Sequence, residues 1–122
     1  MPEDVMTDDE RMRRIDDLLT HVWMVRTFLK HSEEAEEDEE LAEVQRKLYD
    51  YTHSLGTAWT AQDSEAYLRQ AKKKFHRLRQ ATEQFSEIQP EISTHMTFQM
   101  ARRSLETAVA EVGPLLDGYE PS

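Results

Sequence analysis

The segment Thr20–Val44, THVWMVRTFLKHSEEAEEDEELAEV, decides how this chain folds. Its first half is rich in apolar residues, whereas seven of the eight residues that follow Ser32 carry a carboxylate. We call this set the acidic run: Glu33, Glu34, Glu36, Glu37, Asp38, Glu39 and Glu40. Burying such side chains would cost about 2 kcal/mol or more each, so the helix before them must leave the core here. We therefore expect a helical hairpin with the acidic run at its tip. The alternative is one long helix that pairs with another chain.

Apolar residues on both sides of the acidic run recur at steps of three and four, the spacing of a helix with one buried face. Before the run they are Ile15, Leu18, Val22, Val25 and Leu29, and after it Leu41, Val44, Leu48, Tyr51 and Leu55. Thr7 and Glu10 have the T-x-x-E spacing of a capping box, which predicts the start of the first helix. Gly56 is expected to end the second.

Two more helices follow in the second half of the chain. Asp63 or Thr60 is the candidate N-cap for the third. Pro90 suits the first turn of a fourth, which Gly113-Pro114 ends or kinks. The predicted fold is all-α, an antiparallel up-down four-helix bundle with helices near residues 8–32, 39–56, 63–88 and 90–113. Residues 1–122 are expected to form one domain, with an acidic connector at 33–40 and short flexible termini.

Composition excludes several functional classes. The 122 residues contain no cysteine, so disulfides and thiolate chemistry are ruled out. The net charge of −10 argues against nucleic acid as a partner, because phosphate neutralisation dominates such binding. No apolar stretch approaches the roughly 18 residues of a membrane span, and the acidic N-terminus is unlike a secretory signal. We expect a cytoplasmic protein without a cofactor or a metal.

Apolar residues outside the core stripes point to a contact surface. Ile92, Met96 and Met100 are spaced four apart, and Trp23 and Met24 lie outside the stripe of the first helix. The first and last helices are neighbours in an up-down bundle, so these five residues are expected to form one outer apolar patch. They predict a non-enzymatic helical module that self-associates or binds a protein partner.

A basic patch lies on the third predicted helix. It consists of Arg69, Lys72, Lys73, Lys74, Arg77 and Arg79. One interpretation is a solvated helix face, and the other is a docking site for an acidic partner such as the acidic run of another copy.

The histidines suggest an alternative function. RTFLKH (Arg26–His31) and RKLYDYTH (Arg46–His53) resemble the arginine, four to six residues, histidine pattern of HEPN-type ribonucleases, which are helical bundles. That resemblance implies Arg26, His31, Arg46 and His53 as catalytic residues. The predicted heptads place no histidine at an a or d position, so we expect no inward metal site.

The sequence ARRSLET, at residues 101–107, resembles the last-helix motif of small four-helix proteins found within ribosomal RNA genes and diversity-generating elements. Arg103 stands where that motif has glycine. The resemblance implies an interaction protein that assembles into rings.

Overall fold

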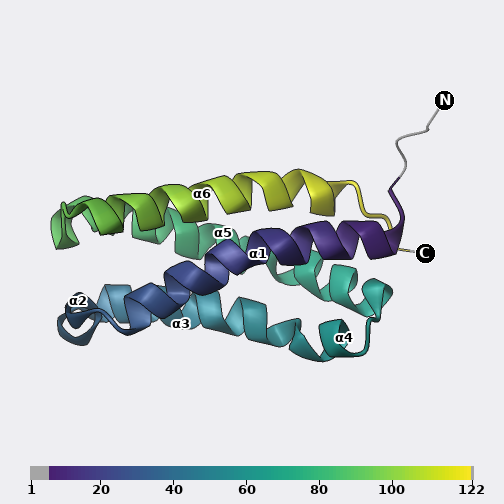
Figure 1. Ribbon diagram of the computed structural model, residues 1–122, viewed down its shortest axis with the longest axis horizontal. Coiled ribbons are helices and arrows are strands. Elements are labelled where there is room, and N and C mark those ends of the chain that lie inside the picture. The colour runs from purple at the N-terminus through teal and green to yellow at the C-terminus, as the bar shows by residue number, and fades with distance from the viewer. Residues whose placement is uncertain (1–5, 122) are drawn as a thin grey trace.

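The computed structural model describes residues 6–121, and this part of the chain is all-α, without a strand (Figure 1). Its helices are α1 (Asp8–Lys30), α2 (Glu33–Glu37), α3 (Glu39–Ser54), α4 (Gly56–Thr60), α5 (Ser64–Ile92) and α6 (Met96–Asp117). The long helices α1, α3, α5 and α6 lie side by side, and each runs opposite to the long helix before it (Figure 1). The short α2 and α4 lie in the connections on either side of α3.

The packing of the long helices determines which helix faces remain exposed to solvent. The closest pairs are α3 with α5, α1 with α6, α1 with α3 and α5 with α6. A smaller contact joins α1 and α5 across the centre. In cross-section α1 and α5 therefore lie at opposite corners of the molecule, and their outer faces point in opposite directions.

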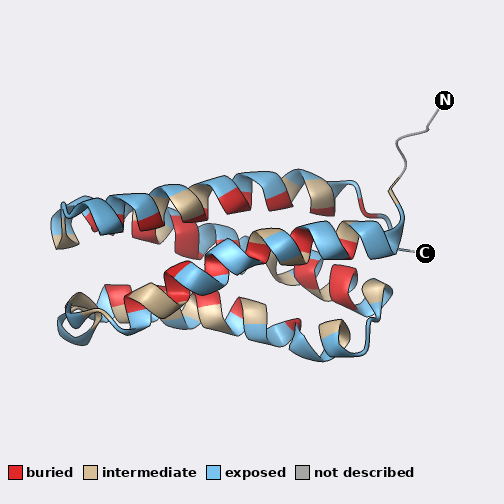
Figure 2. Ribbon diagram, viewed as in Figure 1, coloured by how far each residue is buried: buried red, intermediate tan, exposed pale blue. Residues whose placement is uncertain are grey.

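One hydrophobic core runs along the centre and receives side chains from all four long helices (Figure 2). Its largest fully buried residues include Met12, Leu48, Tyr67, Phe85 and Leu105. Because these residues follow helical spacing in the sequence, each long helix buries one stripe and exposes the opposite face.

The acidic run forms the tip of a helical hairpin, so the alternative of one long helix is wrong. α1 ends at Lys30 and the Ser32 hydroxyl accepts from the amide of Ala35, which starts α2. The Asp38 carboxylate accepts from the amide of Leu41 at 2.9 Å and starts α3. Two side-chain caps thus break the helix where neither glycine nor proline does.

The last helix begins and ends later than its sequence predicts. Pro90 lies in the last turn of α5 instead of starting a helix, and α6 begins at Met96, after Ser93–His95. The amide of Ser93 donates to the carbonyl of Gln89, whose side chain donates back to the carbonyl of Ser93 at 2.8 Å. These bonds close the turn after the proline.

Gly113-Pro114 does not end α6, which continues to Asp117. Gly113 lies against the ring of Phe75, and a Cβ there would come 3.5 Å from that ring. A Cβ at this position would therefore be in ordinary van der Waals contact with the ring, and the amide of Gly118 donates to the carbonyl of Pro114 one turn later.

The expected stop at Gly56 is also displaced. α3 ends at Ser54 and Gly56 opens α4 instead. Gln62 takes the left-handed conformation after α4, with φ of 53°, and its side chain donates to the carbonyl of Trp59. Within residues 6–121, no helix is both long enough and apolar enough to cross a bilayer.

Candidate interaction surface

Four large hydrophobic side chains are exposed in residues 6–121, and they belong to α1 and α6. The exposed fraction is 67% for Met24, 60% for Met96, and 44% each for Trp23 and Met100. Trp23 and Met24 lie in the second half of α1, and the two methionines lie in the first half of α6. Since α1 and α6 are antiparallel neighbours, all four lie toward the same end of the molecule as the acidic run (Figure 1).

Two contacts fix the register of α1 against α6. The rings of Phe28 and Phe98 meet edge to face, with their centroids 5.1 Å apart. The Ser104 hydroxyl lies 3.3 Å from Nδ1 of His21. Met24 falls between His21 and Phe28, and Met100 falls between Phe98 and Ser104, so these methionines lie at the same height along the two helices.

Trp23 lies on the other flank of α1, toward α3. Its ring centroid is 6.3 Å from that of Tyr49, and it borders a groove of about 340 Å³ between α1 and the α3–α4 corner. Leu19, Leu55 and Trp59 supply apolar lining to this groove. The exposed apolar surface therefore wraps around α1, from Trp23 across Met24 to the methionines of α6.

Ile92 does not belong to this surface as the sequence suggested. It lies in the last turn of α5 and not in the last helix, and it is half-buried against the core. The misplacement follows from Pro90, because starting a helix there carries Ile92 into the wrong element. We define the outer apolar patch as Trp23, Met24, Met96 and Met100.

The structure does not bring the predicted catalytic residues together in their sequence pairs. Arg26 is buried, with its guanidinium 4.3 Å from the centroid of the Tyr49 ring and 5.1 Å from that of Trp23. His31, Arg46 and His53 are exposed. His53 stacks on Tyr49, with centroids 5.2 Å apart and planes 14° apart. Arg26 and His53, from different pairs, thus share contact with one tyrosine.

The pairing of His21 with Ser104 joins α1 and α6 and was not visible in the sequence, where 82 residues separate the two. Both residues lie on regular helices, whose backbone amides are already hydrogen-bonded. An oxyanion site built from backbone amides needs free N–H donors, and the interior of an unbroken helix supplies none. Within residues 6–121, no three acidic or histidine side chains are grouped to hold a metal.

Asp16 is the carboxylate in the groove beside Trp23. Burial raises the pKa of this carboxyl above its ordinary value, and the hydrogen bond from the Tyr67 hydroxyl at 2.8 Å opposes the rise. The folded state therefore holds the proton more tightly than the unfolded state. The wild-type protein loses stability from this group as pH rises from the unfolded pKa through the folded one.

Asp16→Asn is expected to abolish that loss, because asparagine can still accept from Tyr67 and carries no charge to desolvate. Urea unfolding followed by circular dichroism should give equal stabilities near pH 3, below the ordinary pKa of aspartate of about 3.9, and the variant should be more stable than wild type near neutral pH. A variant less stable at neutral pH and equal at pH 3 would show that the charge stabilises the fold.

The basic patch and the acidic run lie on different parts of the chain and do not pair with each other among the described residues. Arg69 binds Glu65 of its own helix at 2.6 Å, and Lys72 donates to the carbonyl of Tyr119. Lys74 and Arg77 line a groove of about 310 Å³ between α3 and α5, whereas Arg79 lies near the ring of Phe75. The residues of the basic patch therefore have different contacts and do not form one uniform surface.

Several polar residues at the end of α5 are used structurally. The Ser86 hydroxyl donates to Glu106 at 2.6 Å and lowers the pKa of that carboxyl, with a smaller contribution from Arg102. Arg102 also donates to Glu106 and to Gln89, which joins α5 to α6.

Comparison of the chain with protein-family models, curated proteins and solved structures finds no match.

Proposed function

We propose that this protein is a non-enzymatic interaction module, an antiparallel up-down four-helix bundle that self-associates or binds a protein partner through the outer apolar patch. The observation that supports this most directly is where large hydrophobic side chains are exposed. In residues 6–121 all four of them fall on the adjoining halves of α1 and α6. Apolar side chains gathered in this way on a charged surface are typical of association sites.

The chemistry of the patch suits a protein partner. Methionine is flexible and polarisable, so it adapts to varied partner surfaces, and tryptophan is enriched among the residues that dominate binding energy. The acidic run lies at the same end of the molecule (Figure 1). Its charge keeps this end solvated and would steer encounter with a basic partner more than it would add affinity.

Met24→Glu is expected to weaken association through the patch by at least tenfold, or about 1.4 kcal/mol, because it places a charge at the most exposed apolar position. Size-exclusion chromatography with light scattering over a range of concentrations measures self-association directly. Ala66→Glu is the matched control, since it adds the same charge at an exposed position on α5.

If the wild type is monomeric, pull-down from native extract with the same variants tests the partner-binding form. Partner capture that Met24→Glu removes and Ala66→Glu retains would support the proposal. A monomer that captures no protein in a Met24-dependent way would overturn it.

The alternative function is a helical ribonuclease of HEPN type. The observation that favours it is the meeting of Arg26 and His53 at Tyr49, which places a cation and an imidazole around one ring. It predicts RNA cleavage that His53→Ala removes while the helical signal is unchanged. Absence of cleavage by the pure protein across several RNAs would exclude it.

A further inference from the structure

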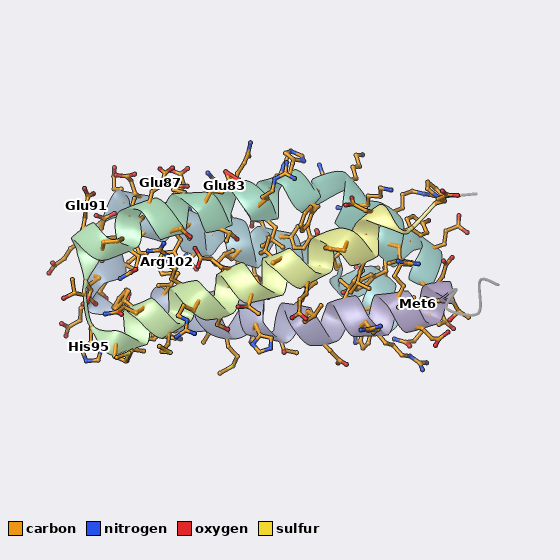
Figure 3. All side chains as sticks on the ribbon, turned by 90° about the horizontal axis from the view of Figure 1, so that it is seen from above. Met6, Glu83, Glu87, Glu91, His95 and Arg102 are labelled. Atoms are coloured by element: carbon orange, nitrogen blue, oxygen red, sulfur yellow. The ribbon has the colours of Figure 1, made fainter. Side chains whose placement is uncertain are left out.

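The outward face of α5 is divided into a basic half and an acidic half. After Glu65 in the first turn, the first half of α5 carries the basic patch, and Glu83, Glu87 and Glu91 near its end project away from the molecule (Figure 3). All the charged residues on this face are exposed, and no other helix covers it. α5 is therefore a long, solvent-facing helix with opposite charge at its two ends.

The charges on this face have a symmetric arrangement about Gln80. Arg69, Lys73, Gln80, Glu87 and Glu91 point within about 40° of one direction, since successive helical residues turn by about 100°. We call these five residues the α5 line. Lys73 and Glu87 lie seven residues from Gln80 on either side, and Arg69 and Glu91 lie eleven residues from it. These separations correspond to about 10 and 16 Å along the helix axis.

Most of the charged side chains of the α5 line form no ion pair within one chain. Among the described residues, Arg69 pairs with Glu65, whereas Lys73, Glu87 and Glu91 make no ion pair. Oppositely charged side chains usually alternate at spacings of three and four on an exposed helix, where they can pair locally. Here like charges are grouped instead, which leaves their pairing capacity for another molecule.

We propose that the α5 line is a docking surface for the α5 line of a second copy, packed antiparallel about a two-fold axis at Gln80. In that arrangement Arg69 lies opposite Glu91 of the partner copy and Lys73 lies opposite Glu87 of the partner copy. The two-fold axis repeats both pairs, so four ion pairs form around a neutral centre. A parallel arrangement would place like charges opposite each other, so the charge pattern also selects the orientation.

A contact made of exposed ion pairs is weak and sensitive to salt. It is therefore expected to be populated at low ionic strength and to provide orientation more than affinity. This inference does not depend on the proposed function, because α5 lies diagonally across the molecule from α1 and carries none of the four patch residues. A protein with both surfaces would have two different self-complementary contacts and could form larger assemblies.

Complementary charge reversal tests the proposal in the Met24→Glu background, which removes association through the outer apolar patch. The first variant carries Arg69→Glu and Lys73→Glu, so its line is wholly acidic. The second carries Glu87→Lys and Glu91→Lys, so its line is wholly basic. Each variant alone is expected to be monomeric, and an equimolar mixture is expected to form a heterodimer, detected by sedimentation velocity at about 50 mM salt, where screening is limited. The association constant should fall at least about tenfold at 500 mM salt.

The matched control carries Glu33→Lys and Glu36→Lys. It has the same change in net charge as the second variant, but the change is placed in the acidic run. Mixed with the first variant, it is expected to remain monomeric. A mixture of the two line variants that stays monomeric at low salt would overturn the proposal, as would equal association of the control mixture.

A second measurement tests the register, because the chain contains no native cysteine. Gln80→Cys in the Met24→Glu background should be joined into dimers by a short bis-maleimide at low salt, since the two-fold axis brings these positions together. Thr107→Cys, at an exposed position on α6, is the control and should cross-link no faster than chance collision allows. Equal cross-linking at both positions would contradict the proposed axis.

Discussion

Phe85→Ala is expected to lower the free energy of unfolding by about 3–5 kcal/mol. Phe85 lies on α5 and is fully buried in the core shared by the long helices. Its removal loses the transfer free energy of the ring and leaves a cavity that close-packed neighbours fill only in part. A domain of this size is usually stable by only about 5–15 kcal/mol, so this one change could remove most of its stability.

Phe75→Ala is the matched control for Phe85→Ala, because it deletes the same ring from the same helix at a half-buried position. We expect it to cost less than half as much, since its ring keeps contact with solvent and packs on Gly113 of α6. Urea unfolding followed by far-UV circular dichroism measures both. Equal losses, or a loss below about 1.5 kcal/mol for Phe85→Ala, would show that the core is not centred on this part of α5.

Helical periodicity predicted the all-α fold, because apolar residues at steps of three and four indicate a helix with one buried face, whichever helix packs against it. The capping box at Thr7 and Glu10 was also predicted, and both of its hydrogen bonds are present. These features depend on residues close in sequence, where local chemistry decides the structure. The N-cap at Asp63 belongs to the same class, and its carboxylate accepts from the amide of Ala66.

Proline and glycine residues predicted helix boundaries less reliably in the second half of the chain. The sequence predicts a helix start at Pro90, yet this residue lies within the last turn of α5, and α6 continues past Gly113-Pro114. Packing of α6 against α5, with Gly113 on Phe75, outweighs the local breaking tendency of these residues. The error moved Ile92 into the wrong helix and so into the wrong surface.

The position of Trp23 could not be deduced from a helical wheel alone. The wheel shows that Trp23 lies outside the core stripe, but not which neighbour it faces. In the structure it faces Tyr49 of α3, and Met24 separates it from the methionines of α6. That arrangement, like the pairing of His21 with Ser104, depends on how separate helices align. Four positions of the α5 line are the converse case, because Arg69, Lys73, Gln80 and Glu87 fall within one predicted helix. Glu91 joins them only because α5 continues past Pro90.

Arg26→Glu is expected to lower the free energy of unfolding by about 3 kcal/mol or more, whereas Arg26→Met should change it by less than about 1 kcal/mol. Arg26 is 9% exposed, and its Nε makes no hydrogen bond within the described residues. Its guanidinium instead lies near the rings of Tyr49 and Trp23. Glutamate would bury an anion against the negative faces of both rings, which repel it.

Methionine has nearly the length of arginine and keeps a favourable contact with aromatic rings. It forfeits the cation–π attraction, about 1–2 kcal/mol at a partly desolvated site, but it also removes a buried N–H without an acceptor, which costs a similar amount. Urea unfolding of both variants tests this balance, with Arg46→Glu as the control because Arg46 is an exposed arginine on α3. Equal destabilisation by methionine and glutamate would mean that the positive charge itself stabilises the contact of α1 with α3. Because Arg26→Met should keep the fold, it also separates the two functions: an interaction module keeps its association, and a ribonuclease that depends on Arg26 loses cleavage.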